Sequence, residues 1–358
     1  MGVTAWREFL SLGPARRDHL PAGRIALGIA LPLGALLLAG RGDLFIYAAF
    51  ASFTGIYARH EPARSRLTHQ LWAAGLLLLC MGLGQVLARG HASPWTVVLV
   101  GAPVAAAGAV LAALLGLRPA GALFFVFAVT TIASLPEPAP TLDALVVAGG
   151  TAALCVLLGL LGARFSERVR PGELAPPPHH GLAPGELAWH GARHLIAAGV
   201  GGALGVWSGF GHSSWAMVAA VAPIAVVGHR ARIARAVHRV TGTLGGIGVA
   251  VFLLAFPLGP WVQVGLVVAL QFLAELFVSR NYGLALLFVT PLALLMSRLG
   301  HPSDPWQLVT ARAVETVIGA VVGLLVVVLV RSPAERRTEH VGTNGSVHSG
   351  DDHVTRPP

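Results

Sequence analysis

The sequence contains no lysine, little charge of either sign and only two cysteines. Charged residues make up 11% of its 358 residues, whereas soluble proteins usually carry about 25%. Hydrophobic residues reach 55%, and the mean hydropathy is +0.71. These values exclude an ordinary soluble domain and indicate a polytopic membrane protein.

Cysteine chemistry, metal binding and catalysis have little support in the sequence. Cys80 and Cys155 both fall inside apolar runs, so they suggest neither a disulfide framework nor a metal site. The histidines of the polar segments lack companion cysteines or acids at ligand spacing. No Ser-His-Asp set and no paired catalytic carboxylates are present, so we expect no enzyme activity and no cofactor.

The net charge at pH 7 is +9, and arginine supplies every basic residue in that count. In a soluble protein such a charge would suggest a nucleic acid partner. Here the arginines lie between apolar runs rather than along one soluble face, so the expected partner is the lipid bilayer and not nucleic acid.

Twelve apolar runs are candidate membrane spans, and they predict an all-α polytopic membrane protein with about twelve transmembrane helices. A spanning helix needs about 20 residues, so the first, second, seventh and eighth runs are short. Two alternatives follow for these four runs: either flanking polar residues extend each helix, or the runs are re-entrant and do not cross the membrane. The runs lie near 24–39, 44–58, 68–88, 95–116, 119–135, 142–163, 194–209, 212–228, 240–257, 260–278, 282–298 and 306–330.

The distribution of arginine predicts the orientation of these spans. With twelve crossings and a cytoplasmic N-terminus, 21 of the 25 basic residues fall on the cytoplasmic side and three on the outer side. Only Arg312 lies within a span. Because cytoplasmic loops are enriched in basic residues, both termini are expected in the cytoplasm. A hairpin that enters and returns without crossing would leave this count almost unchanged.

The two halves of the chain resemble each other, which predicts two parallel six-helix repeats. A shift of 169 residues aligns Arg24 with Arg193 and the basic loop 59–69 with 228–238. Near the end of each half the offset becomes 162, which aligns Gly121 with Gly283. Repeats that both begin in the cytoplasm are related by an axis along the membrane normal. The expected divisions are a cytoplasmic interfacial N-terminus (1–23), the first repeat (24–164), a cytoplasmic linker (165–192), the second repeat (193–331) and a disordered cytoplasmic tail (332–358).

Ionisable residues inside a membrane are costly and are therefore candidates for function. In the twelfth span, spacings of three or four place Arg312, Glu315, Thr316, Gly319 and Gly323 on one helix face. At 1.5 Å per residue, Arg312 lies roughly 8–10 Å below the outer boundary. One interpretation is that Arg312 and Glu315 form a structural ion pair beside small residues that pack against a neighbouring helix. The other is that they bind an anion or carry a proton.

Glu275 is the second candidate, near the cytoplasmic end of the tenth span. Arg312 is roughly 20 Å away in depth, whereas Arg239 begins the ninth span at the depth of Glu275, so Arg239 is the predicted partner. The carboxylate of Glu275 is either structural or a proton acceptor. Thr290 precedes Pro291 inside the eleventh span, where the helix is kinked for packing or broken at a transport site.

The glycines of the ninth span, Gly242 and Gly246, are expected to pack helices closely, as are Gly319 and Gly323. They lack the preceding strand and the lysine of a phosphate-binding loop.

Four pieces of the second half stand in a characteristic order and spacing, namely His212 to Met217, Arg235 to Gly246, Glu275 to Pro291 and Arg312 to Gly319. Through these pieces, the second half of the chain resembles the fusaric acid resistance protein-like (FUSC) family of integral membrane transporters, within the aromatic acid exporter superfamily. The resemblance covers roughly residues 193–331. The first half looks like a degenerate copy of the second, since it keeps the basic hairpin but lacks counterparts of Glu275 and Glu315.

The resemblance implies export of aromatic acids or similar small organic anions, driven by protons, across the plasma (cytoplasmic) membrane of a bacterium. Plant aluminium-activated malate channels look similar in pairing six-span units around one pore. A passive anion channel is therefore one alternative, and a membrane scaffold without transport is another. A transporter should line a midplane cavity with Arg312, Glu315 and Thr290, whereas a scaffold would seal the charges in a dry pair. The oligomeric state stays open.

Overall fold

The computed structural model describes residues 12–14, 17–165, 167, 183–226, 228–300 and 304–330. Within these ranges all regular secondary structure is helical and no strand occurs, so the predicted all-α class is confirmed. The N-terminal segment 1–23 lies partly outside the described residues, the linker 165–192 largely outside them, and the tail 332–358 wholly outside them.

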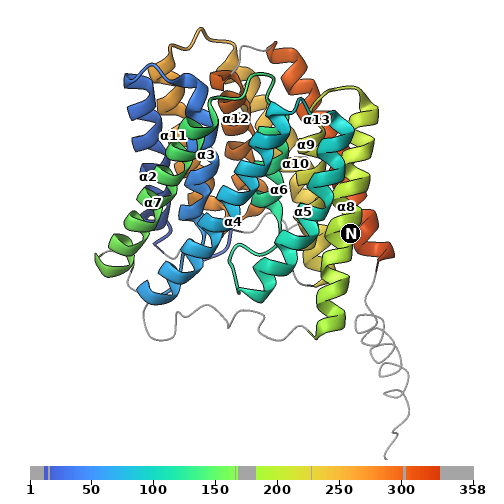
Figure 1. Cartoon of the computed structure of the whole chain (residues 1–358). Helices are drawn as coiled ribbons and strands as arrows, with labels where there is room; N and C mark the ends of the chain where they lie inside the picture. The colour runs from blue at the N-terminus through green and yellow to red at the C-terminus, as the bar shows by residue number, and fades with distance from the viewer. Residues whose placement is uncertain are drawn as a thin grey trace, which may run out of the picture.

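Seven helices of the described chain are long and apolar enough to cross a membrane by length and composition. They stand side by side in Figure 1. Their lengths suit a hydrocarbon layer of about 30 Å at 1.5 Å per residue. They are α2 (His19–Leu38), α4 (Ala63–Arg89), α5 (Pro94–Leu114), α7 (Thr141–Phe165), α10 (His229–Leu254), α11 (Pro260–Phe277) and α13 (Pro305–Leu329).

Two further long helices complete the second half. Helix α8 (Pro184–Ser208) has 25 residues and begins with a proline, at a position where a missing N–H costs nothing. Helix α12 (Tyr282–Gly300) has 19 residues and contains Pro291. The helix continues through Pro291, so the break predicted there as one alternative does not occur.

Three helices are too short to cross a membrane alone. They are α3 (Phe45–Ser52), which follows the 3-10 turn η1 (Gly42–Leu44) and continues into η2 (Phe53–Ile56), α6 (Leu123–Ala133), and α9 (Ser213–Val221), which continues into η3 (Ala222–Ala225). All nine residues of α9 are buried. Nine residues rise only about 13 Å, and backbone groups at membrane depth need protein partners, so the core of the bundle surrounds these helices.

The structure shows how long the predicted spans are. The first and seventh runs are extended by flanking residues, one of the two predicted alternatives, and form α2 with 20 residues and α8 with 25, whereas the second and eighth runs stay short. The fifth run, predicted over 119–135, gives only the 11 residues of α6. Gly121 has φ +85°, a left-handed conformation that favours glycine, and it turns the chain just before α6 begins.

Equivalent helices of the two halves make equivalent contacts. Helix α4 packs against α6 and α7, and α10 packs against α12 and α13. Helix α3 contacts α7 as α9 contacts α13. The first helix of each half packs against the fourth helix of the other half, since α2 contacts α11 and α8 contacts α5. Both halves therefore build one bundle rather than two separate ones.

Four glycines lie where two helices approach most closely. A Cβ atom at Gly242 or Gly246 of α10 would collide with atoms of α12. A Cβ atom at Gly319 or Gly323 of α13 would collide with the backbone of α9. Small residues at such crossings let helix backbones pack closely in a membrane.

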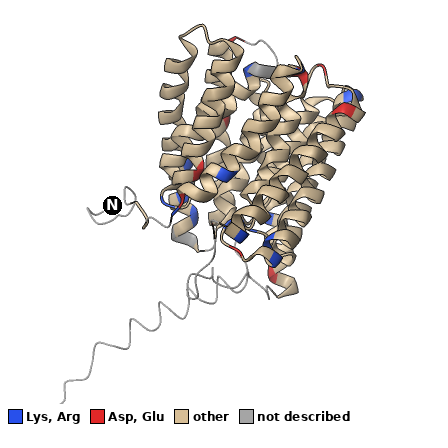
Figure 2. Ribbon diagram, turned by 90° about the vertical axis from the view of Figure 1, so that its left-hand side faces the viewer, with Lys and Arg blue, Asp and Glu red and all other residues tan. Residues whose placement is uncertain are grey.

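One end of the bundle carries most of the charge, as Figure 2 shows. At this arginine-rich end, Glu167 accepts Arg24 Nε at 2.8 Å and Arg66 Nη1 at 2.7 Å. All three side chains are nearly inaccessible. In the second half, Arg193 Nε donates to the Val330 carbonyl at 2.7 Å. In each half an arginine near the start thus binds the chain beyond the last helix.

Candidate functional site

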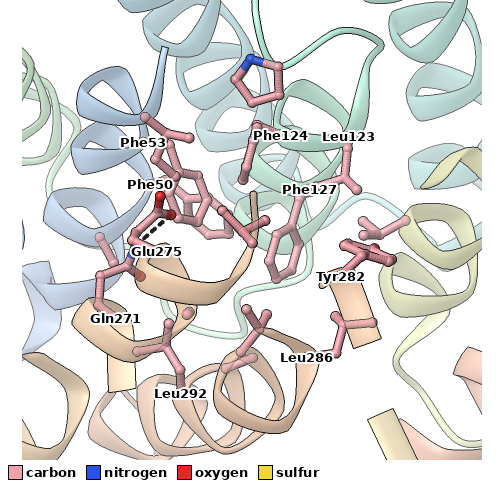
Figure 3. A pocket seen from close by; sticks show the side chains of 18 of the residues that line it. Phe50, Phe53, Leu123, Phe124, Phe127, Gln271, Glu275, Tyr282, Leu286 and Leu292 are labelled. Atoms are coloured by element: carbon pink, nitrogen blue, oxygen red, sulfur yellow. Dashed lines mark hydrogen bonds between the residues drawn. The ribbon is translucent and has the colours of Figure 1, made fainter. Parts of the chain in front are cut away.

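A pocket of about 450 Å³ lies between the two halves of the bundle. Its walls come from α3, η2 and α6 of the first half and from α9 to α13 of the second half. Figure 3 shows the phenylalanines of α3, η2 and α6 facing Leu286 and Leu292 of α12 across the pocket. The volume falls within the range of about 300–1,000 Å³ that is typical of small-molecule sites.

Four phenylalanines, Phe50, Phe53, Phe124 and Phe127, form the side of the pocket that we call the aromatic wall. Phe50 meets Phe53 at a ring-centroid distance of 5.5 Å and Phe127 at 5.0 Å, both edge to face. Phe53 and Phe124 lie 4.7 Å apart. Edge-to-face contacts of this kind are favourable arrangements for aromatic rings, so the wall holds its rings in fixed orientations.

Arg312 reaches the pocket from α13, and no carboxylate among the described residues forms an ion pair with it. It is only 2% exposed, and in the described part of the chain neither Nε nor Nη1 has a hydrogen-bond partner. Its guanidinium carbon lies 5.1 Å from the centroid of the Trp215 ring, within the range of a cation–π contact. A buried guanidinium with free donors is suited to bind an anion.

Two arginines of α10 surround Tyr282 in the same pocket. Arg239 Nη1 donates to the Tyr282 hydroxyl at 3.1 Å, and its Nε is without a hydrogen-bond partner among the described residues. The guanidinium carbon of Arg235 lies 3.9 Å from the Tyr282 ring centroid, while Arg235 Nε donates to the Ala222 carbonyl. These contacts fix two positive charges beside the cavity.

The pocket carries an excess of positive charge. Five of its lining residues are arginine and two are glutamate. One of these, Glu61, contacts His69 Nδ1 at 2.5 Å, and the other, Glu275, forms an ion pair. Neither carboxylate therefore neutralises Arg312, and the field within the pocket favours an anion.

Glu275 is paired with Arg59, so the predicted partner Arg239 is wrong. Arg59 Nη1 lies 3.3 Å from Glu275 Oε2, and Arg59 Nη2 donates to the Glu275 carbonyl at 2.6 Å. Gln271 donates to the other carboxylate oxygen at 3.2 Å. Equal depth in the membrane suggested Arg239, but depth gives no lateral position. The ion pair joins the first half to the second, because Arg59 follows η2 and Glu275 lies in α11.

Replacing Arg59 with methionine should destabilise the protein, because it leaves the Glu275 carboxylate buried without a counter-charge. We expect a loss of about 3–5 kcal/mol in unfolding free energy, the usual effect of removing one member of a buried pair. Denaturant unfolding in detergent measures it. The double variant Arg59→Met/Glu275→Met should recover most of the loss, and a double variant no more stable than Arg59→Met would contradict a direct pair.

The structure separates the other predicted candidates from the pocket. Glu315 is fully buried, and the Ser208 hydroxyl donates to its carboxylate at 3.4 Å. It forms no ion pair with Arg312 in the described structure. Thr316 is buried beside it on α13, and Thr290 of α12 packs against Gly246. Arg312, Arg239 and Glu275 line the pocket, whereas Glu315, Thr316 and Thr290 do not.

Sequence reasoning missed the aromatic wall, Arg59 and Tyr282 as site residues. Phenylalanines in apolar helices look like ordinary core or lipid-facing residues, and Arg59 was counted only as a topological charge. One signal was available for Tyr282 and Trp215, since both lie in the pieces that carry the family resemblance. No group of three or more metal-ligating residues occurs in the parts of the chain that the structure describes.

Comparison with known proteins supports the resemblance of the second half. Residues 196–326 match the family model described as fusaric acid resistance protein-like, which confirms the relationship expected over residues 193–331. The uncharacterized membrane protein YvaC of Bacillus subtilis (strain 168) is 32% identical over 118 residues. That match covers 33% of this chain and 19% of the relative, so the chain spans only about a fifth of it. No solved structure matches the chain.

Proposed function

We propose that this multi-pass membrane protein, whose residues 196–326 match the fusaric acid resistance protein-like family, exports small organic anions. Aromatic acids are the proposed substrates, the proton gradient is the proposed energy source, and the location is the plasma membrane of a bacterium. The observation that carries the proposal is the pocket between the halves, in which the buried Arg312 presents unpartnered donors beside an aromatic wall.

The proposal includes two six-helix repeats, the first over 24–164 and the second over 193–331. The equivalent packing of helices in the two halves supports it. So does the lining of the pocket, because residues related by the offsets of 169 and 162 meet there. These pairs are Ile46 and Trp215, Ala49 and Val218, Ile56 and Ala225, Ala120 and Tyr282, Phe124 and Leu286, and Phe127 and Val289. We place the pocket on the axis that relates the repeats.

The proposal also includes twelve crossings with both termini in the cytoplasm. The arginine-rich end of the bundle then faces the cytoplasm, as the enrichment of basic residues in cytoplasmic loops requires (Figure 2). The short helices α3, α6 and α9 count as crossings only together with the 3-10 turns and loops that extend them. Such irregular backbone is tolerated at membrane depth when protein surrounds it.

The chemistry of the pocket favours an anion with an apolar body. Arg312 and Arg239 offer unpaired donors to a carboxylate, and a guanidinium binds a carboxylate in a bidentate geometry. Most of the other residues that line the pocket are apolar, and they include the aromatic wall of the first half. Glu275 is the proposed proton-carrying residue, since its carboxylate lines the same cavity and pairs with an arginine.

Flux of benzoate in proteoliposomes tests the export function. Vesicles carrying the protein should move benzoate faster than empty vesicles, and an imposed pH gradient should increase the rate. Flux equal to that of empty vesicles would contradict the transport proposal and favour a membrane scaffold without transport. Flux that ignores the pH gradient, with a current following the benzoate gradient, would replace the exporter by a passive anion channel.

Changing Arg239 to glutamine tests the second arginine with the residue that occupies the equivalent position of the first half, Gln70. The variant keeps a polar side chain at this position but loses the charge and the contact of Nη1 with the Tyr282 hydroxyl. A hydrogen bond to a charged group contributes about 1.5–3 kcal/mol, so benzoate flux should fall by roughly 10- to 100-fold. Arg239→Lys, which keeps the charge, should retain more flux than Arg239→Gln. Equal flux in the two variants would argue against a role for the charge.

A further inference from the structure

The two sides of the pocket are equivalent in position but different in chemistry. Helix α6 places Phe124 and Phe127 against the cavity, and the offset of 162 relates them to Leu286 and Val289 of α12, which also line it. The aromatic rings of this pair of helices therefore lie on one side only.

The charges show the opposite asymmetry. Arg239 and Arg312 line the pocket, whereas the positions related to them in the first half are Gln70 and Gly150, and neither lines it. The second half thus supplies most of the cations, and the first half supplies the phenylalanines. The aromatic wall lies outside the family match, because all four of its phenylalanines precede residue 196.

The rings of the aromatic wall are held by one another and are partly open to the pocket. Phe53, Phe124 and Phe127 are half-buried, whereas Phe50 is only 4% exposed and contacts Phe53 and Phe127. The distance of 4.7 Å between the Phe53 and Phe124 ring centroids adds a contact between η2 and α6. The wall can therefore offer ring faces and edges to a bound molecule without first being ordered.

We infer that Phe53, Phe124 and Phe127 are the specificity-determining residues of the pocket and select anions with a flat aromatic body. The inference rests on the proposed function, in which arginines of the second half bind the carboxylate. Burial of apolar area favours aromatic and aliphatic bodies alike. Contact between aromatic rings is favourable beyond the burial of area. The phenylalanines therefore bind an anion with an aromatic body more tightly than one with an aliphatic body.

Benzoate and cyclohexanecarboxylate are suitable probes, because they share the carboxylate and a six-membered ring but differ in aromaticity. In proteoliposomes the wild-type protein should prefer benzoate. The double variant Phe124→Leu/Phe127→Val, which copies the residues of the second half, should lower the preference roughly two- to tenfold. Transport of cyclohexanecarboxylate should change little, and the single variant Phe124→Met, which nearly keeps the volume, should shift the preference in the same direction.

Phe288→Leu is the matched control. Phe288 lies on α12 and stacks on Phe277 at 5.8 Å, but it does not line the pocket, so its replacement should leave the preference unchanged. An unchanged preference in Phe124→Met and in the double variant, with both probes still transported, would overturn the inference and leave the export function standing. A wild-type protein that transports neither probe would overturn both.

Discussion

Replacement of Arg312 by methionine is expected to abolish most benzoate transport while leaving the protein folded. Arg312 is 2% exposed and has no carboxylate partner in the described structure. Its Nε and Nη1 also lack hydrogen-bond partners there. A charged hydrogen bond contributes about 1.5–3 kcal/mol, so losing even one to the substrate lowers flux roughly 10- to 100-fold. Methionine preserves most of the volume of the side chain and removes both the charge and the N–H donors.

The stability of the Arg312→Met variant separates a functional charge from a structural one. A charge inside a membrane span costs about 2.5–3.5 kcal/mol on insertion scales, and no ion pair within the described structure offsets that cost for Arg312, which contacts the ring of Trp215. Denaturant unfolding should therefore show unchanged or increased stability together with lost flux. A large loss of stability with flux retained per folded molecule would make Arg312 a structural residue.

Replacement of Glu167 by glutamine is expected to have the largest effect on stability. Glu167 neutralises Arg24 at 2.8 Å and Arg66 at 2.7 Å, and the Arg66 side chain is fully buried. Without the carboxylate, two buried guanidinium groups lose their only ion-pair partner among the described residues. Removing one partner of a buried pair costs about 3–5 kcal/mol, so the unfolding free energy in detergent should fall by at least that amount.

Asp43→Asn provides the control for Glu167→Gln. Asp43 also pairs with an arginine, Arg41, at 2.9 Å, but the two side chains are 44% and 38% exposed. Exposed pairs contribute about 0–1 kcal/mol, so this variant should unfold almost like the wild type. Equal losses in the two variants would show that burial of the Glu167 network does not decide its contribution.

Patterns that depend on one helix at a time could be predicted from the sequence. Apolar runs gave the all-α class, and residues 193–331 gave the family relationship later matched over 196–326. The offset between the halves related residues that line one pocket. Lengths were less predictable where a single backbone conformation decides them, as at Gly121, whose φ of +85° shortens the fifth run to α6.

Relations between helices could not be predicted in the same way. Depth along the membrane normal predicted that Glu275 does not pair with Arg312, and the described structure pairs Glu275 with Arg59 instead. Depth could not choose between Arg59 and Arg239, because both were predicted to lie toward the same side. Spacing along α13 put Glu315 on the face of Arg312, yet Glu315 lies beside Ser208 and outside the pocket. Only packing shows which apolar phenylalanines face a cavity, and the aromatic wall was missed for that reason.

Equilibrium binding of radiolabelled benzoate to the purified protein tests the central claim most directly, namely that the two halves share one anion site. The pocket lies between the halves, and Arg312 has no equivalent at Gly150, so binding should saturate at one benzoate per chain. Arg312→Met should weaken it roughly 10- to 100-fold. Saturation at two benzoates per chain, or unchanged affinity in Arg312→Met, would contradict the account.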